Sequence, residues 1–280
     1  MVAILIIQIY VFYRVNTELQ QHSSVTGDNP SNYGLNAQDE NFPSTDGVQL
    51  SGWYVDRSDA KTTVILVPGF QKTKASLLPL ARDLYQAGYA VFLVDLRAQG
   101  ESTGNRVYLG TREWEDVATT YDFVKAIPEN NSRKVGFIGV SMGASSVLNE
   151  VGKTGKGDFV VAGVPFANFN HLIPLQLNSS HLSLFFEPFV KVATFLEFGT
   201  RYFTDVPAHQ IANIHVPILL MGGDKDQTVP PGDAAYLFGL AHSPRLLWQS
   251  PNGHFIYTDD PAAFLAHALP FLGRYGSNIN

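Results

Sequence analysis

The chain has 280 residues, of which 45% are hydrophobic, and it carries a formal net charge of −6 with no cysteine. This size and apolar content allow one α/β domain or two small domains with a large buried core. The acidic balance, without a dense run of Lys and Arg, argues against a nucleic-acid partner. The lack of cysteine excludes disulfides, thiolate metal sites and a cysteine nucleophile, but it does not identify a compartment.

Residues 1–15 are predicted to form an anchor-like segment, because residues 1–13 (MVAILIIQIYVFY) are apolar except for Gln8. Thirteen helical residues span about 20 Å, which is short of the roughly 30 Å hydrocarbon layer. The segment also lacks the basic start and the small-residue cleavage site of a signal peptide. We expect it to associate the chain with a membrane and to hold the domain outside the cytoplasm. The alternative is an amphipathic or core helix in a cytoplasmic protein.

Residues 16–44 are predicted to be a solvated linker, because residues 16–40 are rich in Asn, Gln, Ser and Gly. From residue 45 to 280 strand-like and helix-like segments alternate, which predicts a single domain. The expected strands are 48–55, 62–67, 89–94, 134–138, 159–164, 218–221 and 245–249, and the expected helices are 76–87, 112–127, 144–151 and 262–275. This alternation predicts a doubly wound, mostly parallel sheet with helices on both faces, which binds ligands beyond the carboxyl ends of its strands.

The segment 166–210 interrupts this alternation and predicts a helical lid insertion of two elements. It has few charges and eight phenylalanines: Phe166, Phe169, Phe185, Phe186, Phe189, Phe195, Phe198 and Phe203. Ordinary core packing accounts for some of them. Because so apolar an insertion can also cover the ligand-binding edge of the sheet, Phe166, Phe169, Phe185 and Phe186 are candidates to line an apolar substrate pocket.

The stretch Gly139-Val140-Ser141-Met142-Gly143 matches G-x-S-x-G between a predicted strand and a predicted helix. In a nucleophile elbow the serine occupies a sharp, strained turn that exposes its hydroxyl group. The flanking glycines leave room for neighbouring backbone, and the N-terminus of the following helix favours a developing negative charge. Ser141 is therefore the candidate nucleophile. The alternative is a glycine-rich turn with an incidental serine.

A serine hydroxyl needs a general base, and the base needs a third group that fixes its tautomer. In the chain order Ser…Asp…His, these two groups follow two later strands. His254 follows the last predicted strand and is the candidate base. Asp226 lies deep in the loop after the preceding strand and is the candidate acid, whereas Asp224 is expected to form a turn with its own backbone.

Together these motifs resemble the α/β-hydrolase superfamily over residues 45–275. The resemblance is carried by G-V-S-M-G at 139–143, G-x-x-D-x-x-V-P at 223–230 and G-H-F at 253–255. Residues 67–70 (VPGF) are similar to the H-G-x loop of the family, and residues 95–102 (DLRAQGES) are similar to its D-x-R-G-x-G-x-S loop. The resemblance implies an oxyanion hole made by the backbone N–H groups of Phe70 and Met142.

The chain departs from the family pattern at two places. Pro68 replaces the usual histidine of the first loop, and Ala98 and Gln99 replace the glycine and histidine of the second. The lack of H-G-G-G disfavours the hormone-sensitive-lipase type, and a serine at the elbow disfavours the dehalogenase type. The N-terminal segment with D-G-V-x-L-x-G-W-Y at 46–54 resembles membrane-associated serine hydrolases of the ABHD and serine-aminopeptidase-like branches.

The sequence thus predicts a carboxylester hydrolase that works through an acyl-enzyme intermediate. Its expected substrate is a small-molecule ester with an apolar acyl or aryl group, and neither a cofactor nor a metal is expected. A peptidase or amidase with the same three residues is the nearest alternative, because the motifs determine acyl transfer but not the leaving group. A non-catalytic ligand-binding protein of the same fold is a further alternative.

Overall fold

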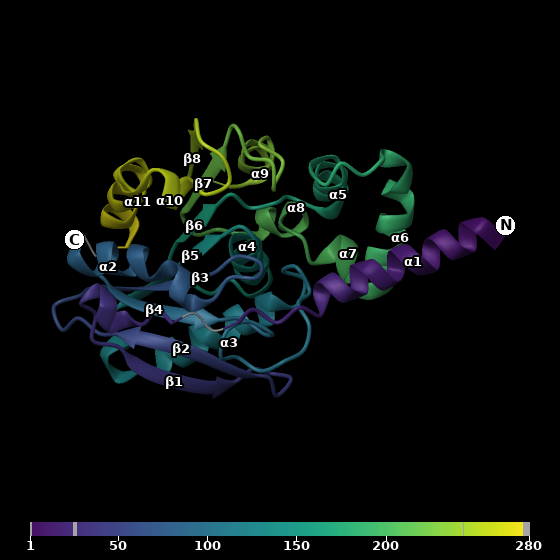
Figure 1. The fold of residues 1–280 in the computed structure, drawn as a ribbon. Helices are drawn as coiled ribbons and strands as arrows, with labels where there is room; N and C mark the ends of the chain where they lie inside the picture. Colours follow the sequence, from purple (N-terminus) through teal and green to yellow (C-terminus); the bar gives the residue numbers. More distant parts are fainter. Residues whose placement is uncertain (1, 25–26, 243, 277–280) are drawn as a thin grey trace.

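The computed structural model describes residues 2–24, 27–242 and 244–276, whose eight strands form one sheet (Figure 1). The strand order is β1-β2-β4-β3-β5-β6-β7-β8. β2 is antiparallel to its neighbours β1 and β4, and all pairs from β4 to β8 are parallel. The predicted α/β architecture with a mostly parallel sheet is confirmed.

The strands are β1 (Gln38–Pro43), β2 (Gln49–Val55), β3 (Thr62–Val67), β4 (Ala90–Asp95), β5 (Lys134–Val140), β6 (Val160–Gly163), β7 (Ile218–Gly223) and β8 (Arg245–Ser250). The α-helices are α1 (Val2–Leu19), α2 (Leu78–Gln86), α3 (Glu113–Ala126), α4 (Met142–Thr154), α5 (Phe169–Ser179), α6 (Glu187–Phe198), α7 (Arg201–Thr204), α8 (Pro207–Gln210), α9 (Asp233–Leu240), α10 (Ile256–Asp259) and α11 (Pro261–Tyr275). Each predicted strand is present, with its ends shifted by at most two residues.

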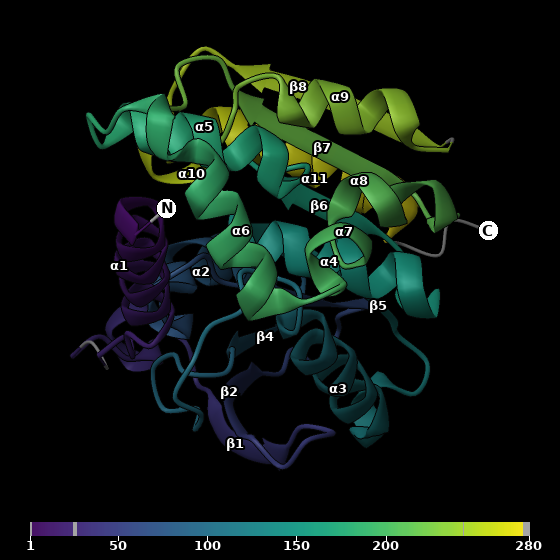
Figure 2. The same cartoon turned by 90° about the vertical axis from the view of Figure 1, so that its right-hand side faces the viewer.

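Helices cover both faces of the sheet, and each face has its own apolar core. The α3, α4 and α9 helices lie on one face, which is turned to the viewer in Figure 2, and α2, α10 and α11 lie on the other. All six residues of β3 are buried between these layers. A continuous β-branched and apolar run suits such a strand, because neither of its faces meets water.

Strand β1 lies inside the range predicted to be a linker. It pairs antiparallel with β2 at the edge of the sheet, and Phe42 is its only buried residue. Its sequence, QDENFP, has no alternation of apolar and polar residues. A strand with nearly all of its side chains in solvent does not need this pattern, so it was not predicted from the sequence. A 3-10 helix at Pro30–Tyr33 also lies in this range, so the segment 16–44 contains regular structure.

Helix α1 covers residues 2–15 of the anchor-like segment and continues to Leu19. It packs along α6, as both views show (Figures 1 and 2). Gln8 Nε2 donates to the Phe189 carbonyl at 3.2 Å, and Asn16 Nδ2 donates to Glu197 Oε1 at 2.8 Å. α1 also carries exposed apolar side chains: Ile4, Leu5, Ile6, Ile9, Tyr10 and Tyr13. In the part of the chain that the structure describes, no helix combines the length and the apolarity needed to cross a membrane.

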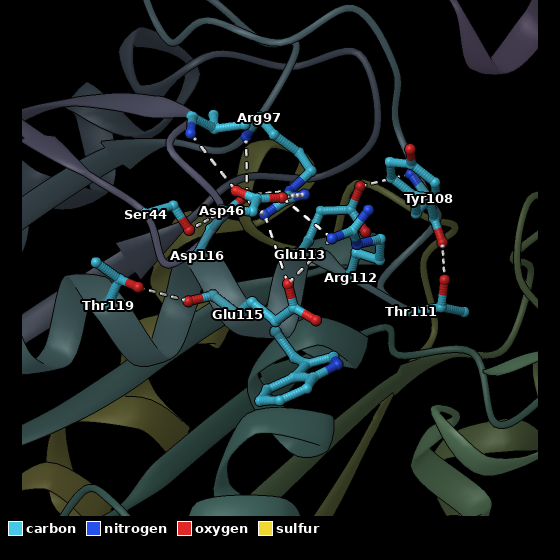
Figure 3. A network of polar contacts seen from close by, with 12 residues as sticks. Ser44, Asp46, Arg97, Tyr108, Thr111, Arg112, Glu113, Glu115, Asp116 and Thr119 are labelled. Carbon is cyan, nitrogen blue, oxygen red and sulfur yellow. Dashed lines mark hydrogen bonds and ion pairs between the residues drawn. The ribbon is translucent and has the colours of Figure 1, made fainter.

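A buried ionic network holds the loop after β4 against α3 (Figure 3). Arg97 donates from Nε and Nη2 to the two carboxylate oxygens of Asp116, at 2.9 and 2.7 Å. Its Nη1 donates to Asp46 at 2.8 Å, and Ser44 donates to Asp116 at 2.9 Å. Burial alone would lower the pKa of the Arg97 guanidinium, but the two carboxylates outweigh burial and raise it. The loop from residue 96 to 103 is therefore fixed by a charged, bidentate contact.

Glu150 of α4 is another buried carboxyl group, and no residue that the structure describes forms an ion pair with it. Its side chain is fully buried, and Oε1 accepts a hydrogen bond from Thr154 Oγ1 at 2.6 Å. Burial raises the pKa of Glu150 from its ordinary value of 4.5 to about 8. The folded chain therefore keeps this proton through a pH range in which the unfolded chain has released it.

We expect Glu150→Gln to stabilise the protein increasingly as the pH rises from 4.5 to 8. In that window the folded wild type binds one more proton than the unfolded chain, so its free energy of unfolding falls with pH, whereas the glutamine variant lacks this loss. The difference in the free energy of unfolding is close to zero at pH 4 and grows to about 5 kcal/mol above pH 8. Urea denaturation of both proteins across this range measures it, and a difference independent of pH would contradict the prediction.

Candidate active site

Ser141 stands at the sharp turn between β5 and α4. Its backbone angles, φ 55° and ψ −121°, lie in a region that residues with a side chain rarely adopt. The Ser141 N–H donates to the Gly163 carbonyl of β6 at 2.8 Å, and its carbonyl accepts from the Ser145 N–H at 3.0 Å. These two bonds to rigid elements hold the strained residue in place, as the nucleophile-elbow motif predicts.

The two glycines of the motif are required by close backbone contacts. A Cβ at Gly139 would lie 2.6 Å from the Gly143 carbonyl oxygen, and a Cβ at Gly143 would lie 2.4 Å from the Val67 carbonyl oxygen. Both distances are shorter than any tolerated carbon–oxygen contact. Larger residues at these positions would push α4 away from β3 and β5.

Ser141, His254 and Asp226 form one chain of hydrogen bonds. His254 Nε2 lies 3.0 Å from Ser141 Oγ, and His254 Nδ1 lies 2.7 Å from Asp226 Oδ2. Because an ionised carboxylate only accepts, Nδ1 carries the proton, and Nε2 is left to accept from the serine hydroxyl. The side chains of His254 and Asp226 are 12% and 2% exposed, which keeps most water away from these contacts.

The parallel register explains how residues this distant in sequence meet. Val140 is paired with Gly163, Gly163 with Met221, and Gly223 with Ser250. The loops after β5, β7 and β8 therefore leave the sheet at one edge.

Asp226 is also held by its own loop. Its Oδ1 accepts the N–H groups of Thr228 at 2.8 Å and Val229 at 2.9 Å, while Oδ2 faces His254. The competing carboxylate, Asp224, is exposed and accepts from Gln249 Nε2 at 3.1 Å. The contact with His254 therefore belongs to Asp226.

The loop after β3 lies against the elbow. Val67 is paired with Gly139, and a Cβ at Gly69 would lie 3.3 Å from Ser141 Cβ and 3.8 Å from Ser141 Oγ. Phe70 follows in this loop. Met142 is the first residue of α4, so its N–H has no acceptor within the helix.

A buried apolar cluster lies beside the Asp226 loop. Its members are Leu19, Phe166, Phe169, Ile173, Leu177, Phe198, Tyr202, Val206 and Val229. Most of them come from the helical segment between β6 and β7, which comprises α5, α6 and the short α7 and α8. Leu19 adds the end of α1, which the sequence did not place near the site.

Some of the four candidate pocket residues belong to this cluster and others do not. Phe166 and Phe169 are buried in it with ring centroids 5.5 Å apart, and Phe186 packs partly buried against it. Phe185 is 61% exposed, so its side chain points away from the cluster. A run of phenylalanines does not distinguish the two faces of a short helix, so the sequence could not show that Phe185 lies outside this cluster.

One polar contact of α5 was not predicted from the sequence. His171 Nδ1 of α5 lies 2.7 Å from Asp233 Oδ1, and Asp233 Oδ2 accepts the Ala167 N–H at 2.7 Å. Burial raises the pKa of Asp233, although these two hydrogen bonds act in the opposite direction. The pair ties α5 to the start of α9. Its two residues lie 62 positions apart, and no local sequence pattern links them.

Comparisons of the sequence agree with these motifs. The sequence model of the family described as serine aminopeptidase, S33, matches residues 58–176. The uncharacterized protein YfhR of Salmonella typhi is 26% identical over 98% of this chain and 88% of its own length. The uncharacterized protein YqkD of Bacillus subtilis is also 26% identical, over 76% of this chain and 70% of its own.

Solved structures share the fold. The Pyrococcus furiosus esterase Pf2001 gives a TM-score of 0.79 at 22% identity, covering 92% of this chain and 99% of that structure. An esterase from Exiguobacterium antarcticum gives a TM-score of 0.65 at 14% identity, covering 84% and 100%. Together with the strand–elbow–helix geometry around Ser141, these likenesses show that the chain has the α/β-hydrolase fold.

Proposed function

We propose that this protein is a serine hydrolase that cleaves carboxylic esters through an acyl-enzyme intermediate. The observation that carries the proposal is the hydrogen-bonded chain from Ser141 Oγ through His254 to Asp226. Ser141 attacks the ester carbonyl while His254 takes its proton, and His254 then returns the proton to the leaving alcohol. Asp226 orients the imidazole and stabilises its charged form. Water repeats the same steps on the acyl-enzyme and releases the acid.

The oxyanion of the tetrahedral intermediate is proposed to bind the N–H groups of Phe70 and Met142. The position of Gly69 against Ser141 and the free N-terminus of α4 support this assignment. Each such donor contributes about 3 kcal/mol to transition-state stabilisation, because it is already oriented before charge develops.

We propose an apolar acyl or aryl group as the substrate portion that the enzyme selects. The buried apolar cluster next to the Asp226 loop supports this preference, since Val229 belongs to the cluster and donates to Asp226. In this proposal α5 and α6, the two elements of the predicted lid, lie over the site as a lid. The contact between His171 of α5 and Asp233 of α9 is consistent with that role.

Hydrolysis of p-nitrophenyl esters from acetyl to dodecanoyl tests the proposal, beside aminoacyl p-nitroanilides under the same conditions. We expect ester hydrolysis with an optimum longer than acetyl, because an apolar acyl group gains about 0.8 kcal/mol for each buried methylene. Activity confined to the anilides would replace the ester proposal by an amidase or peptidase. If the folded protein hydrolyses neither substrate and is not labelled by a fluorophosphonate probe, this result would favour a protein that binds a ligand without catalysis.

A further inference from the structure

Gln99 contacts the peptide that carries the Phe70 N–H. The carbonyl oxygen of this peptide belongs to Gly69, and Gln99 Nε2 donates to it at 3.0 Å. The Lys72 N–H donates to the same oxygen at 3.2 Å and closes the turn. The amide nitrogen, and not the amide oxygen, must face Gly69, because two carbonyl oxygens would repel each other.

This contact determines the direction of the Phe70 N–H. A trans peptide is planar, and its C=O and N–H groups point in opposite directions. A donor that fixes the Gly69 carbonyl on one side therefore fixes the N–H on the other. It also polarises the amide, which strengthens the N–H as a donor. Among the residues that the structure describes, no protein group accepts a hydrogen bond from the Phe70 N–H.

Gln99 is itself held rigidly. Its side chain is fully buried. Its loop is closed by hydrogen bonds from the Ala98 N–H to the Thr103 carbonyl at 2.9 Å and from the Ser102 N–H to the Gln99 carbonyl at 3.0 Å. The neighbouring Arg97 is bound to Asp116 by the buried ion pair. The donor that faces Gly69 thus has little freedom to move.

We infer that Gln99 is a positioning residue of the oxyanion hole, which acts through the Gly69–Phe70 peptide without touching the substrate. The inference rests on the proposed function. It gives the loop after β4 a part in turnover, in addition to its structural contacts with α3.

The test replaces Gln99 by methionine, which keeps the length of the side chain and removes the donor. We expect Gln99→Met to lower kcat about tenfold to a hundredfold, less than the loss of a whole oxyanion donor, because the N–H stays but is misdirected. KM should change little. Inhibition by a trifluoromethyl ketone, whose adduct with Ser141 carries the oxyanion, should weaken by the same factor as kcat/KM. Gln99→His restores an N–H donor and should recover most of the loss.

Gln210→Met is the matched control. Gln210 is also buried and donates from Nε2 to a backbone carbonyl, that of Thr204 at 2.6 Å, but it lies on α8. It should cost comparable stability and leave kcat within about twofold. The inference would be overturned if both methionine variants lost kcat equally, or if Gln99→Met left kcat unchanged. It would also be overturned if Gln99→Met changed KM alone, or if Gln99→His were as slow as Gln99→Met. Failure of the proposed function can be told apart from failure of this inference, because in the former case the wild-type protein itself would show no ester hydrolysis.

Discussion

Replacing Ser141 by alanine is expected to abolish ester hydrolysis, with a fall in kcat of about 10⁴- to 10⁶-fold. The Ser141 hydroxyl is the group 3.0 Å from His254 Nε2, and without it no acyl-enzyme can form. Some rate above that in water should remain, because substrate binding and the oxyanion donors are still present. Steady-state hydrolysis of the preferred p-nitrophenyl ester measures the effect, and peptide mass analysis after fluorophosphonate treatment should find the label on Ser141.

Ser146→Ala provides the control for this variant. Ser146 lies on the same helix, is fully buried, and donates to the Met142 carbonyl within α4. Since alanine suits a helix interior, this change should leave kcat within about threefold. Circular dichroism should show both variants folded. A Ser141→Ala protein that keeps a tenth of wild-type activity would show that another group is the nucleophile.

Asp226→Asn is expected to lower kcat by about 10⁴-fold while leaving the loop intact. The backbone N–H groups of Thr228 and Val229 both donate to Oδ1. In asparagine this position must hold the carbonyl oxygen, so the NH₂ group faces His254. The imidazole Nδ1 then has to accept, which moves its proton to Nε2. An Nε2–H group cannot take a proton from Ser141.

Asp224→Asn tests the same substitution in the same loop. Asp224 is exposed and is bonded to Gln249, so its variant should keep kcat within about twofold. Thermal unfolding of both variants separates a stability effect from a catalytic one. If Asp224→Asn proved to be the more damaging change, the assignment of the acid would have to be reversed.

The fold could be predicted where side chains are buried on both faces. β3 and β4 consist of buried residues only, so their apolar runs mark them clearly. β1 could not be found, because an edge strand with a single buried side chain reads as a loop. For α1, an apolar helix that packs on protein and one that contacts lipid have similar sequences. Gln8 and Asn16 form hydrogen bonds with α6, but their partners lie 181 residues away in the sequence, so no local pattern indicates these contacts.

The candidate site could be located from the sequence because the loops that follow parallel strands lie at one edge of the sheet. Ser141, Asp226 and His254 each follow such a strand, and in the structure their side chains are within hydrogen-bond distance. Their catalytic roles stay a prediction. The contact of Gln99 with the Gly69 carbonyl was not predicted, because Gln99 attracted notice only as a departure from a pattern. The sequence also could not predict which phenylalanines of the segment 166–210 are buried, since Phe185 is exposed whereas Phe166 and Phe169 are buried.

The pairing of α1 with α6 has a consequence for biosynthesis. A ribosome that adds about 5–20 residues per second needs roughly 10–35 s to make the 181 residues between the hydrogen-bonded partners on the two helices. During this interval Val11 and Leu19 on the nascent chain have no α6 to cover them. Translation that stalls before α6 would thus leave an apolar helix available to chaperones or to other nascent chains. We therefore expect slow elongation before α6 to lower the yield of folded protein.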